Sequence, residues 1–175
     1  MMNDLRYPIG LFNSDSSADA SARAQLISQL AETPDRLRAS VESLSIDQLN
    51  TLYRPGGWTV RQVVHHLADA QMNWYVRTKL ALTEKEPVIK PYDEALWAEL
   101  YDSHTGPIKP SLMLIDGACQ RWIDLFRSLS EEQWKCSMNH PERGIVTLDF
   151  VLPLNVWHCR HHTAHILELR KRKGW

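Results

Sequence analysis

WHCRHHTAHI, residues 157–166, holds four of the eight histidines of the chain. It lies within residues 147–173, where apolar residues recur with the period of an α-helix and Thr147 is placed to cap the start. His158 and His162 are four residues apart, so a helix stacks them on one face, about 5–6 Å apart at Cβ. Two imidazoles held in this way can reach one metal ion.

The same spacing relates His161 to His165, and the neighbours of each pair separate the two alternatives. The face of His158 and His162 continues through residues that a bundle would bury: Val151, Asn155, Ile166 and Leu169. The face of the other pair continues into charged side chains toward the C-terminus, those of Glu168 and Arg172. We therefore expect His158 and His162 to be ligands and the other pair to turn toward solvent.

A second helix that carries histidines is predicted over residues 59–82, after the turn sequence YRPGGW, with Thr59 as its N-cap. His66 lies three residues after Val63 and next to Leu67, which places it near the buried face of this helix. His65 shares its face with polar residues and is expected to point elsewhere. One ligand from this helix and two from the last would bring three nitrogens together inside a bundle.

Three histidines form a ligand set with a definite chemistry. Neutral imidazole suits zinc, nickel and ferrous iron, and three protein ligands leave a coordination position open, which is typical of catalytic sites. Zinc lowers the pKa of a water in that position to about 7, and a substrate thiol could occupy it as thiolate. The alternative is a hydrogen-bonded histidine cluster that holds no metal.

Cys159 points about 100° away from His158 and is expected to be a small buried side chain. The HEXXH motif is absent, so a zincin protease is not expected.

The remaining chain supplies two more long helices and one turn-rich segment. Residues 21–44 have a helical period that Pro34 should interrupt, and residues 110–129 begin with a proline, which is favoured in a first helical turn. Residues 138–147 contain the turn sequence PERG, which could close a small β-hairpin before the last helix. The predicted fold class is all-α, a four-helix bundle with a long crossover connection over residues 83–109.

Length and composition fit one domain over residues 1–175. The 20 basic and 21 acidic side chains give a formal charge of −1, so a nucleic-acid or membrane partner is not expected. Three widely spaced cysteines without a CxxC pair are typical of a reducing compartment. The first residues, MMNDLRYPIG, contain no apolar signal segment, and no stretch reaches the roughly 18–20 apolar residues of a membrane helix. We expect a cytoplasmic protein.

Four segments together indicate a similarity to a known family: YPIG at residues 7–10, YRPGGWTVRQVVHHLADAQMN at 53–73, IKPYDEALWAEL at 89–100 and WHCRHHTAHI at 157–166. In this combination the chain resembles the DinB-like metal-binding four-helix-bundle superfamily and, within it, the YfiT-type metal-dependent hydrolases. The resemblance implies metal ligands at His66, which precedes a leucine as in the superfamily, and at His158 and His162. It also implies one divalent ion per subunit, zinc or nickel, and a homodimer. His165 stands where relatives often carry glutamine, so it could support the ligands.

The same resemblance implies a hydrolase that activates water on the metal and acts on a small molecule. Other members of the superfamily resemble thiol S-transferases, which join bacillithiol, mycothiol or glutathione to electrophiles, so this function is the main alternative. A bundle that binds metal without catalysis is the third alternative. Residues 89–100 could cover the open side of the metal site or simply pack on the bundle.

Asn73 and Arg77 are candidates for substrate binding near the metal site. They follow His66 by seven and eleven residues, so they share its face of the helix. They could bind a polar substrate or form a polar rim between helices. His104 and His140 lie in predicted loops and are expected on the surface.

Overall fold

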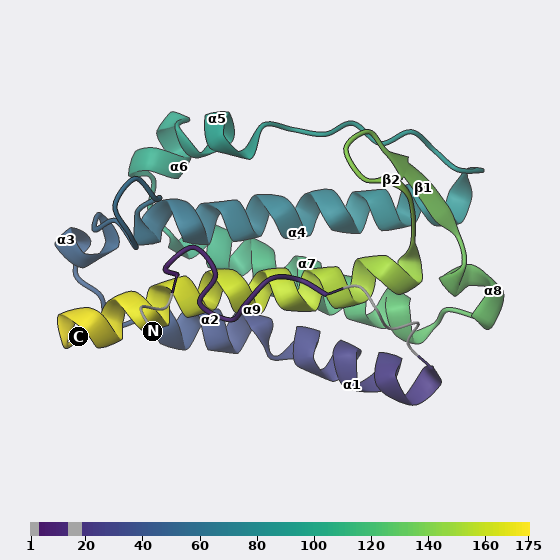
Figure 1. The fold of residues 1–175 in the computed structure, drawn as a ribbon, viewed down its shortest axis with the longest axis horizontal. Coiled ribbons are helices and arrows are strands. Elements are labelled where there is room, and N and C mark those ends of the chain that lie inside the picture. Colours follow the sequence, from purple (N-terminus) through teal and green to yellow (C-terminus); the bar gives the residue numbers. More distant parts are fainter. Residues whose placement is uncertain (1–3, 14–18) are drawn as a thin grey trace.

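Four long helical segments lie side by side in the computed structural model, which describes residues 4–13 and 19–175 (Figure 1). They are α1 (Ala20–Ala31) with α2 (Thr33–Val41), α4 (Val60–Thr83), α7 (Lys109–Arg127) and α9 (Leu148–Lys173). The predicted four-helix bundle is confirmed, together with a small hairpin before the last helix. The expectation that no signal segment is present falls partly on residues 1–3, which lie outside the described residues.

The first long segment is broken at Pro34, as predicted. α1 ends at Ala31 and α2 begins at Thr33, so the proline occupies the first turn of the new helix, where its missing N–H costs no hydrogen bond. The carboxylate of Asp19 starts α1 by accepting a hydrogen bond from the N–H of Ala22 at 2.8 Å.

The two helices that carry His66, His158 and His162 differ in how their N-termini are capped. The hydroxyl of Thr59 accepts a hydrogen bond from the N–H of Gln62, and the Gln62 side chain accepts one from the N–H of Thr59. α9 starts after Thr147, which occupies the predicted N-cap position, but the side chain of Thr147 does not make the expected capping hydrogen bond. The helix continues through Pro153. It ends at Gly174, where a φ of 70° favours glycine.

The order of the helices around the bundle differs from their order in the chain. α4 packs against both α7 and α9, and the α1–α2 segment also packs against both. The α1–α2 segment and α4 are therefore diagonal to each other, and so are α7 and α9. This arrangement puts α4 beside α9, so that the two histidine-bearing helices face each other along their length (Figure 1).

Short helices occupy the connections, and the sequence pattern did not reveal them. They are α3 (Ile46–Leu49), α5 (Glu94–Ala98), α6 (Tyr101–Thr105) and α8 (Glu131–Trp134). Each has only about one turn, which is too short for a hydrophobic period to be visible. α5 and α6 lie in the long connection over residues 83–109, which runs along α4 (Figure 1).

A two-stranded hairpin precedes α9. β1 (Ser137–His140) pairs antiparallel with β2 (Gly144–Thr147), with Met138 opposite Val146. Gly144 has a φ of 73° and closes the turn over residues 141–143. The N–H of Ile89 donates to the carbonyl of Asn139 at 3.1 Å, so the hairpin is also attached to the long connection.

One cluster of buried apolar side chains fills the space between the helices. Its largest fully buried members include Trp122, Phe126, Leu30, Leu37 and Leu67. Burial of these side chains supplies most of the free energy that holds the bundle together. Within residues 4–13 and 19–175, none of the helices combines the length and the apolar character that a membrane crossing requires.

Candidate metal centre

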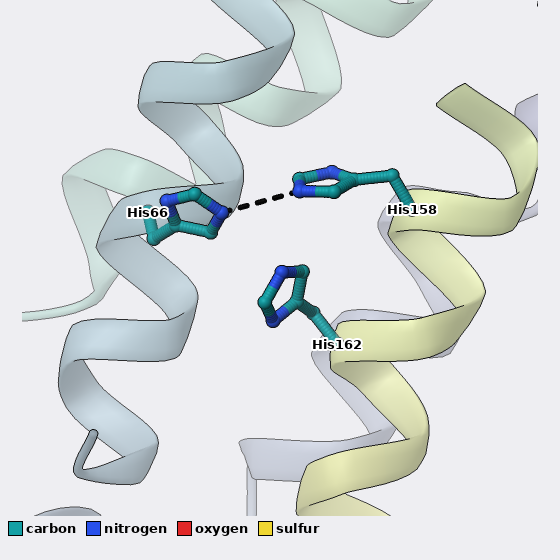
Figure 2. Close-up of side chains that lie close together, drawn as sticks. All are labelled: His66, His158 and His162. Atoms are coloured by element: carbon teal, nitrogen blue, oxygen red, sulfur yellow. Dashed lines mark hydrogen bonds between the residues drawn. The ribbon is translucent and has the colours of Figure 1, made fainter. Parts of the chain in front are cut away.

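Three histidine side chains converge between α4 and α9. Figure 2 shows His66 on α4 facing His158 and His162 on α9. One nitrogen from each ring can be chosen so that all three lie within 4.8 Å of one another. The Nε2 atoms of His66 and His158 are 3.2 Å apart, and the ring centroids of His66 and His162 are 4.7 Å apart. The convergence predicted from the helical faces is confirmed.

Helix geometry explains why these rings meet. His158 and His162 are one turn apart on α9, with ring centroids 4.6 Å apart. The apolar and amide residues that continue their face are all buried, as predicted: Val151, Asn155, Ile166 and Leu169. On α4, Val63 and Ala70 are buried on either side of His66, so that face of α4 points into the bundle.

Burial lowers the pKa of all three imidazoles. Desolvation lowers the pKa of His66 to about 4. For His158 and His162 desolvation is again the largest cause, and the neighbouring histidines add to it, so their pKa lies well below the usual range for histidine. The three rings are therefore neutral at pH 7, which is the state in which imidazole binds a metal ion.

The geometry of the rings fits a metal ion. Two nitrogens bound to one tetrahedral zinc ion at about 2.0–2.1 Å lie about 3.3 Å apart, and Nε2 of His66 is 3.2 Å from Nε2 of His158. The same separation also allows a hydrogen bond between these two nitrogens. The observation that favours the metal-binding alternative is therefore the convergence of three neutral imidazole nitrogens within 4.8 Å of one another.

The other histidine pair of α9 is buried, and the expectation that it turns toward solvent is wrong. His161 is 7% exposed and His165 is 3% exposed. The N-terminal segment covers them: the ring of Tyr7 is 6.0 Å from that of His161, and Nε2 of His165 is 3.2 Å from the carbonyl oxygen of Arg6. Tyr53 stacks on His165 at 4.1 Å. A period along α9 cannot reveal this cover, because it comes from distant parts of the chain.

His165 lies beside the ligands, where it could support them. Its ring centroid is 5.4 Å from that of His162, and burial lowers its pKa to about 4. A supporting role for His165 stays a prediction. His65, by contrast, points away from the site as expected: its Nδ1 lies 2.8 Å from the hydroxyl of Ser111 and its Nε2 lies 3.2 Å from the carbonyl of Gly106.

A cavity of about 490 Å³ gives access to the three histidines. Its lining includes Trp58, whose ring lies 4.7 Å from that of His66 and stacks on His162 at 6.1 Å. Cationic side chains also line it, those of Arg6, Arg54 and Arg143. Sequence reasoning missed these four residues. The one available signal was that Trp58 directly precedes the N-cap of the helix that carries His66.

A second cavity, of about 150 Å³, adjoins the first and shares part of its wall. Both cavities are lined by these two histidines, by Glu94 and by Arg143. Pro91, Tyr92 and Glu94 border the second cavity, so the connection over residues 89–100 forms part of its wall. Of its two expected roles, a cover over the metal site or simple packing on the bundle, neither describes it fully, because it packs along α4 and also borders the cavities.

The two candidate substrate-binding residues on α4 have different surroundings. Arg77 is buried and lines the smaller cavity together with His66. Asn73 lines neither cavity and donates its side-chain amide to the carbonyl of Asp69 at 2.9 Å.

His140 also lines the smaller cavity and is 5% exposed, so its expected place on the surface is wrong. The reason is that the hairpin folds its β1 strand against α4.

Comparison with known proteins identifies the family. A sequence model of the DinB superfamily matches residues 29–166. The chain belongs to the DinB superfamily. Among relatives of this DinB-superfamily chain, a Bacillus cereus protein named "Putative metal-dependent hydrolase" is 49% identical over 174 residues, which are 99% of this chain and 100% of that protein. The Bacillus subtilis protein named "Putative metal-dependent hydrolase YfiT" is 48% identical over 173 residues, which are 98% of this chain and 97% of that protein.

A solved structure agrees with both the family and the fold. The structure of YfiT from Bacillus subtilis matches this DinB-superfamily chain with a TM-score of 0.95 at 48% identity and covers 98% of each chain. That protein is described as "a probable metal-dependent hydrolase with an unusual four-helix bundle topology". The resemblance inferred from the four sequence segments is confirmed, and the chain is YfiT-like.

Proposed function

We propose that this protein is a metal-dependent hydrolase of small molecules, with one divalent metal ion held by His66, His158 and His162. The observation that carries the proposal is the meeting of three neutral imidazoles at a cavity of about 490 Å³. The rim of that cavity includes exposed residues such as Gly56 and Arg143, so a solute can reach the histidines. The names of the relatives from two Bacillus species support the same activity.

The metal ion supplies the chemistry of such a site: when bound, it polarises a substrate oxygen and lowers the pKa of water to about 7. The residues of the chain hold and surround it. The three imidazoles supply neutral nitrogen ligands, and Trp58 packs on two of the rings and keeps them in place. Arg54 and Arg143 put positive charge on the cavity wall, which favours substrates that carry or develop negative charge.

Zinc and nickel are the metals that we propose, because three imidazoles with further positions for water suit both ions. The near-zero net charge supports a small-molecule substrate rather than a nucleic acid or a membrane.

We also propose a homodimer. α4 and α7 pack against each other and both carry exposed apolar side chains that a second copy could cover: Met72 and Val76 on α4, Met113 and Leu114 on α7. Free cysteines agree with a cytoplasmic location.

A thiol S-transferase is the second candidate function. The observation that favours it is the presence of two adjoining cavities that share His66 and His158, because a transferase must hold two reactants at one metal. Bacillithiol or another low-molecular-weight thiol would be the nucleophile in place of water. A purely structural metal site is less favoured, because such sites are closed by protein ligands, whereas this one borders a cavity.

One set of assays tests the proposal. The purified protein, with its metal content measured, is offered a panel of esters and amides, and in parallel a chlorinated aromatic electrophile with several thiols. Hydrolysis that is lost on chelation and restored by zinc or nickel is the expected result. Metal-dependent thiol conjugation without hydrolysis would favour the transferase. Binding of a metal without any turnover would favour the non-catalytic alternative.

A matched pair of variants links any activity to the site. His158→Ala removes a ligand and should abolish the metal-dependent activity. His104→Ala removes a histidine that is more than half exposed in α6, and it should leave that activity intact. Equal activity of His158→Ala and the wild type would contradict the proposed site.

A further inference from the structure

Arg77 is a buried cation without an ionic partner. It is 6% exposed and lines the smaller cavity beside His66 and His158. Its Nη2 donates to the carbonyl oxygen of Lys90 at 3.0 Å. Within residues 4–13 and 19–175, no carboxylate lies within 4.0 Å of its guanidinium nitrogens. A buried charge is costly unless an opposite charge pairs with it, so this arrangement requires a reason.

The surroundings of Arg77 hold its guanidinium in a fixed position at the cavity wall. The guanidinium carbon lies 5.0 Å from the ring centroid of Trp74 and 5.8 Å from that of Tyr92. Arg77 lines the cavity, and its other guanidinium nitrogens are not among the buried, unpartnered polar atoms of the described residues. A guanidinium held in this way can form a fork of two parallel hydrogen bonds with a carboxylate.

His140 supplies a second donor in the same cavity. Its Nδ1 accepts a hydrogen bond from the N–H of Glu142 at 3.3 Å. In a neutral imidazole whose Nδ1 accepts, the proton is on Nε2, which is then a donor. Desolvation is the main cause that lowers the pKa of His140, and nearby Arg77 lowers it further, so this neutral form is the one present at pH 7. The ring of His140 is stacked on Trp74 at 6.0 Å and is thereby held in the cavity wall.

We propose that Arg77 and His140 form a carboxylate-binding subsite beside the metal centre. This inference rests on the proposed function: it specifies that the substrate carries a carboxylate at the end away from its reacting group. The reacting group then lies at His66 and His158, which border both cavities. The aromatic rings of Trp74, Tyr92 and Trp157 line the smaller cavity and fit an apolar linker between the two groups.

The charge and the size of the subsite favour a carboxylate over a phosphate. One guanidinium and one neutral donor balance a single negative charge, whereas a phosphate monoester carries close to two at pH 7. Two acidic side chains, Glu94 and Glu142, also border the cavity and would repel a dianion more strongly. The volume of about 150 Å³ has room for a carboxylate with a short chain.

The test measures binding of defined probes to the full-length, metal-loaded protein by calorimetry. The probes are 3-phenylpropionate, its uncharged analogue 3-phenylpropionamide, and inorganic phosphate. The wild type should prefer the carboxylate to the amide. Arg77→Gln should weaken carboxylate binding by about 10-fold to 100-fold, the range expected for loss of a charge-assisted hydrogen bond, and should leave amide binding unchanged. Arg77→Lys keeps the charge but cannot form two parallel hydrogen bonds. It should bind the carboxylate more tightly than Arg77→Gln and more weakly than the wild type.

Two controls isolate the subsite from general charge effects and from the metal. Arg121→Gln removes an exposed arginine that stacks on Tyr75 and lines neither cavity, and it should bind the carboxylate as the wild type does. The comparison of wild-type Arg77 with Arg77→Gln is repeated in a His158→Ala background. If Arg77→Gln still weakens carboxylate binding in that background, the carboxylate binds at the subsite. This result would hold whether or not the hydrolase proposal is correct.

Several outcomes would overturn the inference. One is equal carboxylate binding by the wild type and Arg77→Gln, and another is equal binding of the carboxylate and the amide. Carboxylate binding that depends on His158 but not on Arg77 would assign the anion to the metal instead. Tighter binding of inorganic phosphate than of 3-phenylpropionate would contradict the chosen ligand class. Undetectable binding of every probe to the wild type, or loss of metal in Arg77→Gln, would also count against it.

Discussion

Nε2 of His66 lies 3.2 Å from Nε2 of His158, although 92 residues separate them in the chain. The contact exists because α4 packs beside α9 in a bundle whose helices do not follow one another around its axis. The two nitrogens belong to neutral rings, so only a proton or a cation between them makes so short an approach favourable. We make four predictions about these helices and the residues around them.

His66→Ala and His158→Ala should each lower metal affinity by more than about 100-fold, because even the loss of a residue that only supports a ligand costs 10-fold to 100-fold. Elemental analysis of each purified variant after equilibration with zinc measures the effect. His104→Ala is the matched control, since that histidine is exposed and lies in α6. Full metal content in His66→Ala would show that the ion is held elsewhere.

Asp69 should make the stability of the protein depend on pH. Desolvation is the main cause that raises the pKa of this carboxyl to about 6 from 3.8, and Asp102 contributes. The native state therefore binds more protons than the unfolded chain between these values, so the free energy of unfolding falls as pH rises from about 4 to 6. At higher pH the full cost of the buried charge is present, about 1–2 kcal/mol when solvent screening at this half-buried group is taken into account.

The variant Asp69→Asn removes this cost. It should be more stable than the wild type by about 1–2 kcal/mol at pH 8, and this advantage should shrink toward zero at pH 4. Urea unfolding of both proteins at the two pH values measures the difference. An advantage that is the same at pH 4 and pH 8 would mean that the carboxyl is not responsible.

Arg23 joins α1 to the start of α9. It is 8% exposed, and its guanidinium lies 2.7 Å from carboxylate oxygens of both Glu131 and Asp149. Arg23→Ala should lower the free energy of unfolding by about 2–3 kcal/mol, somewhat less than for a fully buried pair because the carboxylates retain access to water. Chemical denaturation tests this value. Arg36→Ala breaks an exposed ion pair with Glu32 and should change stability by less than about 1 kcal/mol. Equal effects of the two substitutions would contradict the prediction.

The three cysteines should differ in reactivity toward a thiol reagent. Cys119 and Cys159 are buried, and burial is the main cause that raises the pKa of both thiols, that of Cys159 to about 12. The Cys159 sulfur also accepts a hydrogen bond from the side chain of Gln71 at 2.9 Å. Cys136 is only partly buried and should react first in the native protein. Titration before and after unfolding measures this, and rapid reaction of all three native thiols would refute it.

Local sequence patterns predicted the long helices, the hairpin and the three candidate ligands, but not the short helices in the connections. The break at Pro34 and the cap at Thr59 depend on residues within one turn of each other, so the chain need not be folded to predict them. The stacking of His158 and His162 follows from 3.6 residues per turn, and their buried neighbours identify the correct pair. The position of His66 on the buried side of α4 was predicted from the same helical period.

The elements that pack on those faces could be identified only from the folded structure. The burial of His165 depends on Tyr53 and on the N-terminal segment, and the subsite of Arg77 depends on a hairpin that follows more than 60 residues later. A helical period describes one face of one helix and contains no information on the partner that covers it. Residues far apart in the chain come together through packing of the whole bundle. For this reason the three converging histidines could be predicted, whereas most of the residues that line the two cavities could not.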